Sequence, residues 1–270
     1  MTEWRQLGKR LVWSAILVSV ASYAIFFSPS WFFLTVVELF VILGLLEYFK
    51  LAETKGFFIN RYLGLMFATL LPLPFYFPAE TIIFTVGMLC LFMFNFHKHL
   101  RDQAIIGTAL TLFGLLYVAW PFSFLTKIRA LEHGPQWVFY VIFIVKMGDA
   151  AAYFVGKRFG RHKYAVHISP NKSVEGAVAG FVMTVLTSLG SKLYLSHVPL
   201  DHLVILGVLI GVMGQLGDLA ESLLKRDAGT KDSGHIPGLG GVLDVVDSLL
   251  LTVPVIYYYL MAAESVYLKS

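Results

Sequence analysis

Charge and cysteine are both scarce in this chain. Charged residues make up only 14% of its 270 residues, against about 25% in a typical soluble domain. So little charge cannot keep a soluble protein dispersed when 57% of its residues are hydrophobic. The single cysteine, Cys90, excludes an intramolecular disulfide. Intrinsic disorder is excluded as well, because 15% of the residues are aromatic.

The hydrophobic residues predict an all-α, polytopic integral membrane protein. The apolar stretches are long and continuous rather than alternating, which favours helices over a β-barrel. About 20 apolar residues cross a bilayer. Nine stretches approach that length, namely 11–27, 31–48, 62–77, 81–96, 104–124, 137–155, 177–195, 203–224 and 242–261. We therefore expect about nine transmembrane helices, with 62–77 and 81–96 as the shortest.

The distribution of positive charge predicts the orientation. With a cytoplasmic N-terminus, nine spans leave 16 of the 21 Lys and Arg residues on the cytoplasmic side and four outside, and Lys146 lies within the sixth span. Cytoplasmic loops carry such an excess. The C-terminus is then outside. The net charge of +4 fits loops that face anionic lipid, so nucleic acid is not an expected partner.

Polar residues divide the chain into two regions. Residues 1–135 hold spans one to five and are mostly apolar, whereas residues 136–270 hold spans six to nine and most polar side chains. Charges inside spans are costly and usually functional. Lys146 and Asp149 are such a pair, although they could simply neutralise each other. Glu47, at the end of the second span, is ambiguous between an interface charge and a cavity residue.

Two cytoplasmic segments carry groups that suit phosphate and metal ions. The loop 156–176 combines five cations with glycines and small hydroxyls, which favours a phosphate-rich ligand or, alternatively, lipid head groups. The eighth span places Asp218, Ser222 and Lys225 on one helical face. Asp244 and Asp247 share a face at the start of the ninth span.

These carboxylates predict a divalent cation. Asp218, Asp244 and Asp247 would repel one another at neutral pH without one. Oxygen ligands without a His/Cys set favour Mg²⁺, with two ions as the expected number. Mg²⁺ beside basic loops is typical of phosphoryl or nucleotidyl transfer.

The stretch 222–248, SLLKRDAGTKDSGHIPGLGGVLDVVDS, resembles the signature of the phosphatidate cytidylyltransferases, also called CDP-diacylglycerol synthases. Residues 149–176 are similar to a second block of that family. The chain departs from the family at Leu239, where His is usual, and at Val245, where Arg is usual.

The resemblance implies an Mg²⁺-dependent transfer of the cytidylyl group from CTP to phosphatidic acid. CDP-diacylglycerol and pyrophosphate are then the products, and the site lies on the cytoplasmic side of a bacterial inner membrane. It also implies a homodimer among membrane lipids, and it allows a second, different cation.

The same resemblance assigns roles to residues of this chain. Asp218 and Asp244 are implied as metal ligands, with Asp247 as a ligand or its support. Lys225, Arg226 and Lys231 are implied to neutralise phosphate charge. The implied substrate-binding residues are Asp149, Ser169, Lys172, Glu175, Ser222, Asp232, Gly240 and Gly241.

Two other functions stay open at this point. A membrane CTP-dependent lipid kinase, such as a polyprenol or phytol kinase, would use the same groups but release CDP. An ion-coupled transporter would use Lys146, Asp149 and Asp218 as an ion path. It predicts flux without nucleotide turnover.

Overall fold

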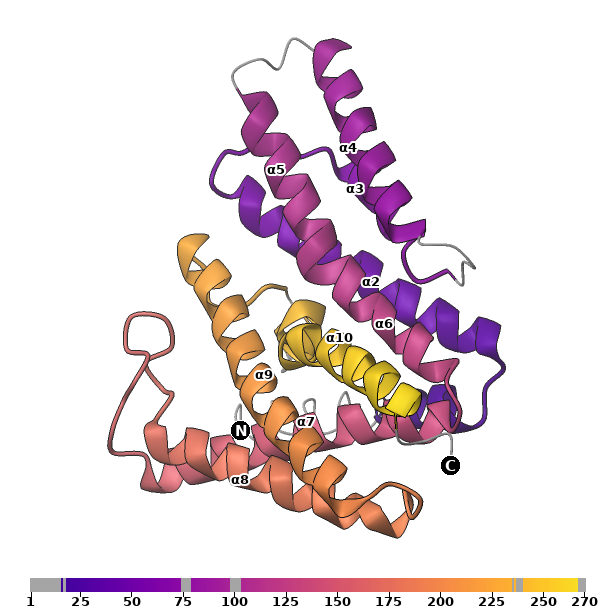
Figure 1. Cartoon of the computed structure of the whole chain (residues 1–270). Coiled ribbons are helices and arrows are strands. Elements are labelled where there is room, and N and C mark those ends of the chain that lie inside the picture. The colour runs from indigo at the N-terminus through magenta and orange to yellow at the C-terminus, as the bar shows by residue number, and fades with distance from the viewer. Residues whose placement is uncertain are drawn as a thin grey trace. The chain divides into compact units, whose positions relative to one another are not determined.

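Helices dominate the structure, a computed structural model that describes residues 16, 18–73, 79–97, 103–234, 236 and 240–266. These residues form helices, turns and two isolated β-bridges but no strand, which confirms the all-α prediction for them. The elements, labelled in Figure 1, are α2 (Ser30–Glu53), α3 (Arg61–Ala68), α4 (Ala79–His97), α5 (Ala104–Gly114), the π-helical turn η2 (Leu115–Ala119), α6 (Trp120–Arg129), α7 (Gly134–Phe159), α8 (Val174–Gly190), the 3₁₀ turn η3 (Ser191–Leu193), α9 (Leu200–Asp227) and α10 (Val242–Val266).

Six of the described helices are long and apolar enough to cross a membrane. They are Ser30–Glu53, Ala104–Arg129, Gly134–Phe159, Val174–Leu193, Leu200–Asp227 and Val242–Ala263. The polytopic membrane prediction is thereby confirmed. A shorter apolar helix covers Glu80–Phe96.

The expected number of nine spans stays a prediction. The stretch 62–77 is helical in its described part only over Arg61–Ala68. Those eight residues rise about 12 Å, well short of the roughly 30 Å of a bilayer core. The stretch 11–27 lies partly outside the described residues.

The chain forms two compact units. Met1–Lys127 together with Leu224–Val245 make the first, and Ile128–Leu223 together with Val246–Ser270 make the second. Helices α9 and α10 therefore each contribute residues to both units. The division expected near residue 135 concerned chemistry rather than compactness, and it stays a prediction.

Aromatic packing organises the helices of the first unit. The rings of Tyr48 on α2 and Phe113 on α5 lie 5.9 Å apart, and the Tyr48 hydroxyl donates to the carbonyl of Leu110 at 3.1 Å. After α5 the chain continues as the wider π-helical turn η2. Pro121, near the start of α6, follows this turn and has no N–H to donate. Inside a helix, a proline removes one backbone hydrogen bond.

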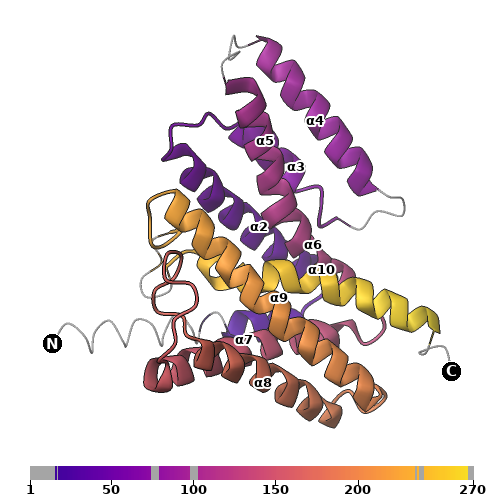
Figure 2. The ribbon, with the colours of Figure 1, turned by 60° about the vertical axis from the view of Figure 1, so that its left-hand side comes forward.

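Small residues bring the helices of the second unit close together. Helices α7 and α8 lie side by side (Figures 1 and 2). A Cβ atom at Gly148 of α7 would lie 2.5 Å from Thr184 Cγ2 of α8. Helix α9 approaches α10 through Gly217, where a Cβ atom would lie 2.5 Å from the carbonyl oxygen of Asp247. This close approach brings the backbone next to Asp218 against that of Asp247.

Candidate active site

A cavity of about 660 Å³ opens within the second unit. It is lined by α7, the loop between α7 and α8, α8 and α9. Part of the lining comes from the membrane-spanning helices, with Val145, Ile210 and Gly211 among its residues. The charged and hydroxyl side chains of the lining are Asp149, Tyr153, Lys157, Lys163, Tyr164, Ser169, Lys172, Ser173, Thr184 and Asp218. The cavity thus combines an apolar wall with several cations.

The loop at the mouth of this cavity is fastened to the start of α8. The hydroxyl of Ser173 accepts a bond from the N–H of Gly176 at 3.3 Å and so caps the helix. Glu175 accepts bonds from the N–H groups of Arg161 at 3.1 Å and His162 at 3.2 Å. Glu175 holds the loop and is not part of the cavity lining, so its predicted contact with substrate stays a prediction.

Two cavity carboxylates are paired with lysines. The ammonium of Lys172 lies 2.9 Å from Asp218 Oδ1, and that of Lys146 lies 3.0 Å from Asp149 Oδ2. The hydroxyl of Ser248 donates to Asp149 Oδ1 at 3.2 Å. The sequence-predicted residues Asp149, Lys172 and Asp218 therefore do line one cavity.

Asp247 belongs to the same electrostatic group. Its side chain is buried and accepts the N–H of Ser248 at 2.6 Å. The charges of Asp218, Lys146 and Asp149 all act on it. Asp149, Asp218 and Asp247, all singled out from the sequence, thus interact electrostatically in the second unit.

Tyr164 in the loop adds a protonated phenol to the cavity. Burial, and then the negative charge of Asp218, raise the pKa of Tyr164 above its ordinary value. The hydroxyl therefore keeps its proton at neutral pH and can donate a hydrogen bond. The sequence offered no signal for this residue beyond its place among the cations of the loop.

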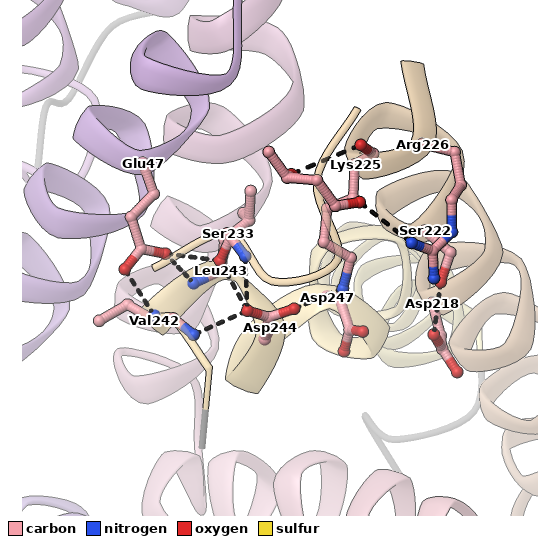
Figure 3. A network of polar contacts seen from close by, with 12 residues as sticks. Glu47, Asp218, Ser222, Lys225, Arg226, Ser233, Val242, Leu243, Asp244 and Asp247 are labelled. Carbon is pink, nitrogen blue, oxygen red and sulfur yellow. Dashed lines mark hydrogen bonds and ion pairs between the residues drawn. The ribbon is translucent and has the colours of Figure 1, made fainter. Parts of the chain in front are cut away.

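Asp244 lies in the first unit, where donors from the chain surround it (Figure 3). Its Oδ2 accepts the N–H of Ser233 at 2.8 Å, the hydroxyl of Ser233 at 2.9 Å and the N–H of Gly241 at 2.7 Å. Its Oδ1 pairs with the ammonium of Lys225, a residue that is 9% exposed. Protein donors thus occupy both oxygens, and the expected role of Asp244 as a metal ligand stays a prediction.

Glu47 of α2 is the residue that the sequence left ambiguous. Its Oε1 accepts the N–H of Val242 at 2.9 Å, and its Oε2 accepts the N–H of Leu243 and the hydroxyl of Ser233, each at 2.8 Å (Figure 3). No sequence motif joins it to residues almost 200 positions away. In the sequence, Glu47 stands out only as a carboxylate at the end of an apolar stretch.

The other predicted residues differ in burial, since Ser222 is buried and Arg226 is exposed. Ser222 donates to Asp218 Oδ1 at 3.4 Å, and Arg226 donates to the carbonyl of Thr230 at 3.1 Å. Lys231 and Asp232 are exposed. Of the two departures from the family pattern, Val245 is half-buried in α10, whereas Leu239 lies outside the described residues. Gly240 has a left-handed backbone with φ of 85°.

Few of the described side chains are arranged to hold the predicted metal ion. Among the described residues, no three His, Cys, Asp or Glu side chains are grouped as a metal site. Mg²⁺ is nevertheless commonly held by one or two carboxylates, with water and substrate phosphates completing its shell. Asp218 and Asp247 supply oxygen donors of that kind in the second unit and therefore fit such an ion.

Comparison with known proteins gives consistent results. Residues 8–263 match the cytidylyltransferase family. A phosphatidate cytidylyltransferase of Synechocystis is 30% identical over an alignment of 287 positions, which covers 92% of this chain and 94% of that protein. Those of Chlamydia muridarum and Bacillus subtilis are 38% and 40% identical over 184 and 148 residues, or 62% and 54% of this chain. The chain spans only 59% and 55% of the length of these two relatives.

Proposed function

We propose that this chain, which belongs to the cytidylyltransferase family, transfers the cytidylyl group of CTP to phosphatidic acid. CDP-diacylglycerol and pyrophosphate are the products. The observation that carries the proposal is the cavity of the second unit, where Lys157, Lys163 and Lys172 meet an apolar wall. A lipid phosphate needs cations for its head group and apolar surface for its chains, and this cavity offers both.

The chemistry needs no nucleophile from the protein. A phosphate oxygen of phosphatidic acid attacks the α-phosphorus of CTP, and the bond from that phosphorus to the bridging oxygen of the β-phosphate breaks. The electron pair leaves with pyrophosphate. The residues then have to orient two polyanions and neutralise their charge. We assign this task to Lys172, which lines the cavity and whose ammonium lies beside Asp218.

We also propose that Mg²⁺ takes part, with Asp218 and Asp247 as its protein ligands. The ion would neutralise phosphate charge and polarise phosphoryl oxygens when bound. Lys225, Arg226 and Lys231 stay predicted to neutralise phosphate on the strength of the family resemblance. For Lys225, the structure adds a pairing with Asp244.

For the topology we propose nine crossings in a bacterial inner membrane, with the N-terminus and the site on the cytoplasmic side. The support is the charge distribution, because 16 of the 21 Lys and Arg residues fall on that side. Two helices also end in basic pairs, Lys157 and Arg158 on α7 and Lys225 and Arg226 on α9. A homodimer is proposed on family resemblance alone.

The test uses the whole chain purified in detergent with Mg²⁺, phosphatidic acid and CTP labelled in its cytidine. We expect labelled CDP-diacylglycerol and unlabelled pyrophosphate. Release of CDP would instead indicate a lipid kinase. Ion flux after reconstitution into vesicles, without nucleotide turnover, would indicate a transporter.

A pair of variants on α9 tests the role of Asp218. Asp218→Asn should lose most of the activity, whereas Asp201→Asn, at the exposed opposite end of the same helix, should keep it. Thermal unfolding shows whether both variants are folded. Normal turnover by folded Asp218→Asn would refute the assignment.

A further inference from the structure

The glycine-rich loop, here residues 228–241, contacts α2 through the carboxylate of Glu47. Glu47 accepts three hydrogen bonds, all of 2.8–2.9 Å, from the hydroxyl of Ser233 in the loop and from the N–H groups of Val242 and Leu243. The last two belong to the first turn of α10, whose N–H groups have no partner within the helix. Glu47 therefore caps the first turn of α10 from α2.

The backbone around this carboxylate leaves no room for side chains. A Cβ atom at Gly234 would overlap Glu47 Oε1, and one at Gly241 would overlap Glu47 Oε2. Glycine at both positions lets the loop close directly on the carboxylate. The contact therefore depends both on the acid of α2 and on the two glycines of the loop.

Ser233 connects Glu47 to Asp244. Its hydroxyl lies 2.8 Å from Glu47 Oε2 and 2.9 Å from Asp244 Oδ2, and its N–H donates to the same oxygen of Asp244. A hydroxyl has one proton to donate, so the two acids share this group. Gly241 and Val242, neighbours in the chain, donate to Asp244 and Glu47 respectively. Displacing Glu47 would therefore disturb the donors that hold Asp244.

We propose that Glu47 is a positioning residue for the glycine-rich loop. It holds the loop and the first turn of α10 so that Asp244 keeps its place beside Lys225. The effect on activity rests on the proposed cytidylyl transfer, whereas the effect on the loop does not. An interface charge would make no such set of bonds, because it would point to water.

The first test replaces Glu47 by Gln and measures amide hydrogen exchange of the whole chain in detergent. A glutamine keeps the size but turns one acceptor oxygen into an NH₂ donor that faces the donors of the loop. We expect faster exchange at residues 233–244 and wild-type exchange in the other helices. Glu53→Gln is the matched control. It removes a carboxylate from the same helix, where Glu53 pairs with Arg61 on the surface.

The second readout is turnover. Loss of hydrogen bonds to a charged acceptor predicts a kcat about tenfold to a hundredfold lower in Glu47→Gln. Ser233→Ala should lower kcat too, and the double variant should be no worse than the poorer single one, because both act through one network. Additive effects would show that Glu47 and Ser233 act independently and would overturn the proposal.

The two readouts separate this inference from the proposed function. If the wild type makes no CDP-diacylglycerol, the function fails, but the exchange experiment still decides the role of Glu47. Wild-type exchange at 233–244 in Glu47→Gln refutes the positioning role whatever the activity. If Glu47→Gln is not recovered folded, Gly234→Ala takes its place, since the added methyl group would displace the same carboxylate.

Discussion

Lys172 links the basic loop to the carboxylates of the cavity. Its ammonium lies 2.9 Å from Asp218, and its side chain is 17% exposed. Removing it takes away a cation that we propose binds substrate phosphate, and leaves Asp218 without that partner. We expect Lys172→Met to raise the KM for CTP or phosphatidic acid about tenfold or more, as the loss of a charged hydrogen bond predicts.

Steady-state kinetics with each substrate varied in turn would measure this effect. Arg158→Met is the control. It removes one positive charge from an exposed side chain near the end of α7 that does not line the cavity. An equal rise in KM for both variants would mean that surface charge in general, and not the cavity lysine, attracts the substrate.

Gly240 and Gly229 form a natural pair for testing the glycine-rich loop. Both have left-handed backbones, with φ of 85° and 71°. Alanine in that region costs about 1–2 kcal/mol at either position. At Gly240, however, the new Cβ would also lie 2.6 Å from Asp244 Oδ2, whereas at Gly229 nothing lies within 4 Å.

We therefore expect Gly240→Ala to lose most of its activity while Gly229→Ala loses only some thermal stability. Activity assays and thermal unfolding in the same detergent would compare them. If both variants keep full activity, the packing of the loop against Asp244 does not matter for turnover.

The chemistry of single residues was partly predictable from the sequence. Lys172 and the acids Asp149, Asp218 and Asp247 were singled out by their unusual charge near membrane spans, and the structure gathers them. The role of Glu47 was not predictable. Its partners lie 186, 195 and 196 positions away, and the last two are backbone N–H groups, which every residue except proline carries.

The close contact between α7 and α8 shapes the cavity. Gly148, Gly180 and Thr184 line both the crossing and the cavity. A methyl group at Gly148 would lie 2.5 Å from Thr184 Cγ2 and would force the helices apart. We expect Gly148→Ala to lower the free energy of unfolding by about 1–3 kcal/mol, the usual cost of overpacking.

The matched control is Gly190→Ala, at the C-terminal end of α8. Nothing lies within 4 Å of a Cβ atom there, so alanine should be neutral or slightly stabilising. Thermal unfolding of both variants in one detergent gives the comparison. Equal melting temperatures would contradict the tight crossing.

Hydropathy predicted most of the helices but did not predict two local features. Within the apolar stretch 62–77, α3 ends at Ala68, shortly before Pro72. Proline and the residue before it both disfavour continued helix, and a hydropathy average does not register this. The π-helical turn η2 was also unpredicted, because widening of a helix leaves the apolar content of a segment unchanged.

At the scale of the whole molecule, the division into two units follows no boundary in composition. Leu224–Val245 belongs with the N-terminal helices although it lies far along the chain, and Glu47 provides the physical reason. The three bonds of Glu47 tie this segment to α2. A sequence profile locates spans one at a time and does not reveal such pairings.

The proposed orientation can be tested across α8. The helix together with η3, Val174–Leu193, has 20 residues and is about 30 Å long, so its two ends reach opposite sides of a bilayer. Arg161, before the helix, and Ser196, after it, are both exposed. Because Cys90 is the sole cysteine, a Cys90→Ala background gives variants with one thiol each.

In right-side-out vesicles, a membrane-impermeant maleimide should label Ser196→Cys at once. It should label Arg161→Cys only after detergent opens the vesicles. We expect this order because the proposed topology puts the five cations of the loop 156–176 on the cytoplasmic side. The reverse order would place the cavity on the outer face, out of reach of cytoplasmic CTP. Immediate labelling of both thiols would mean that α8 does not cross the membrane.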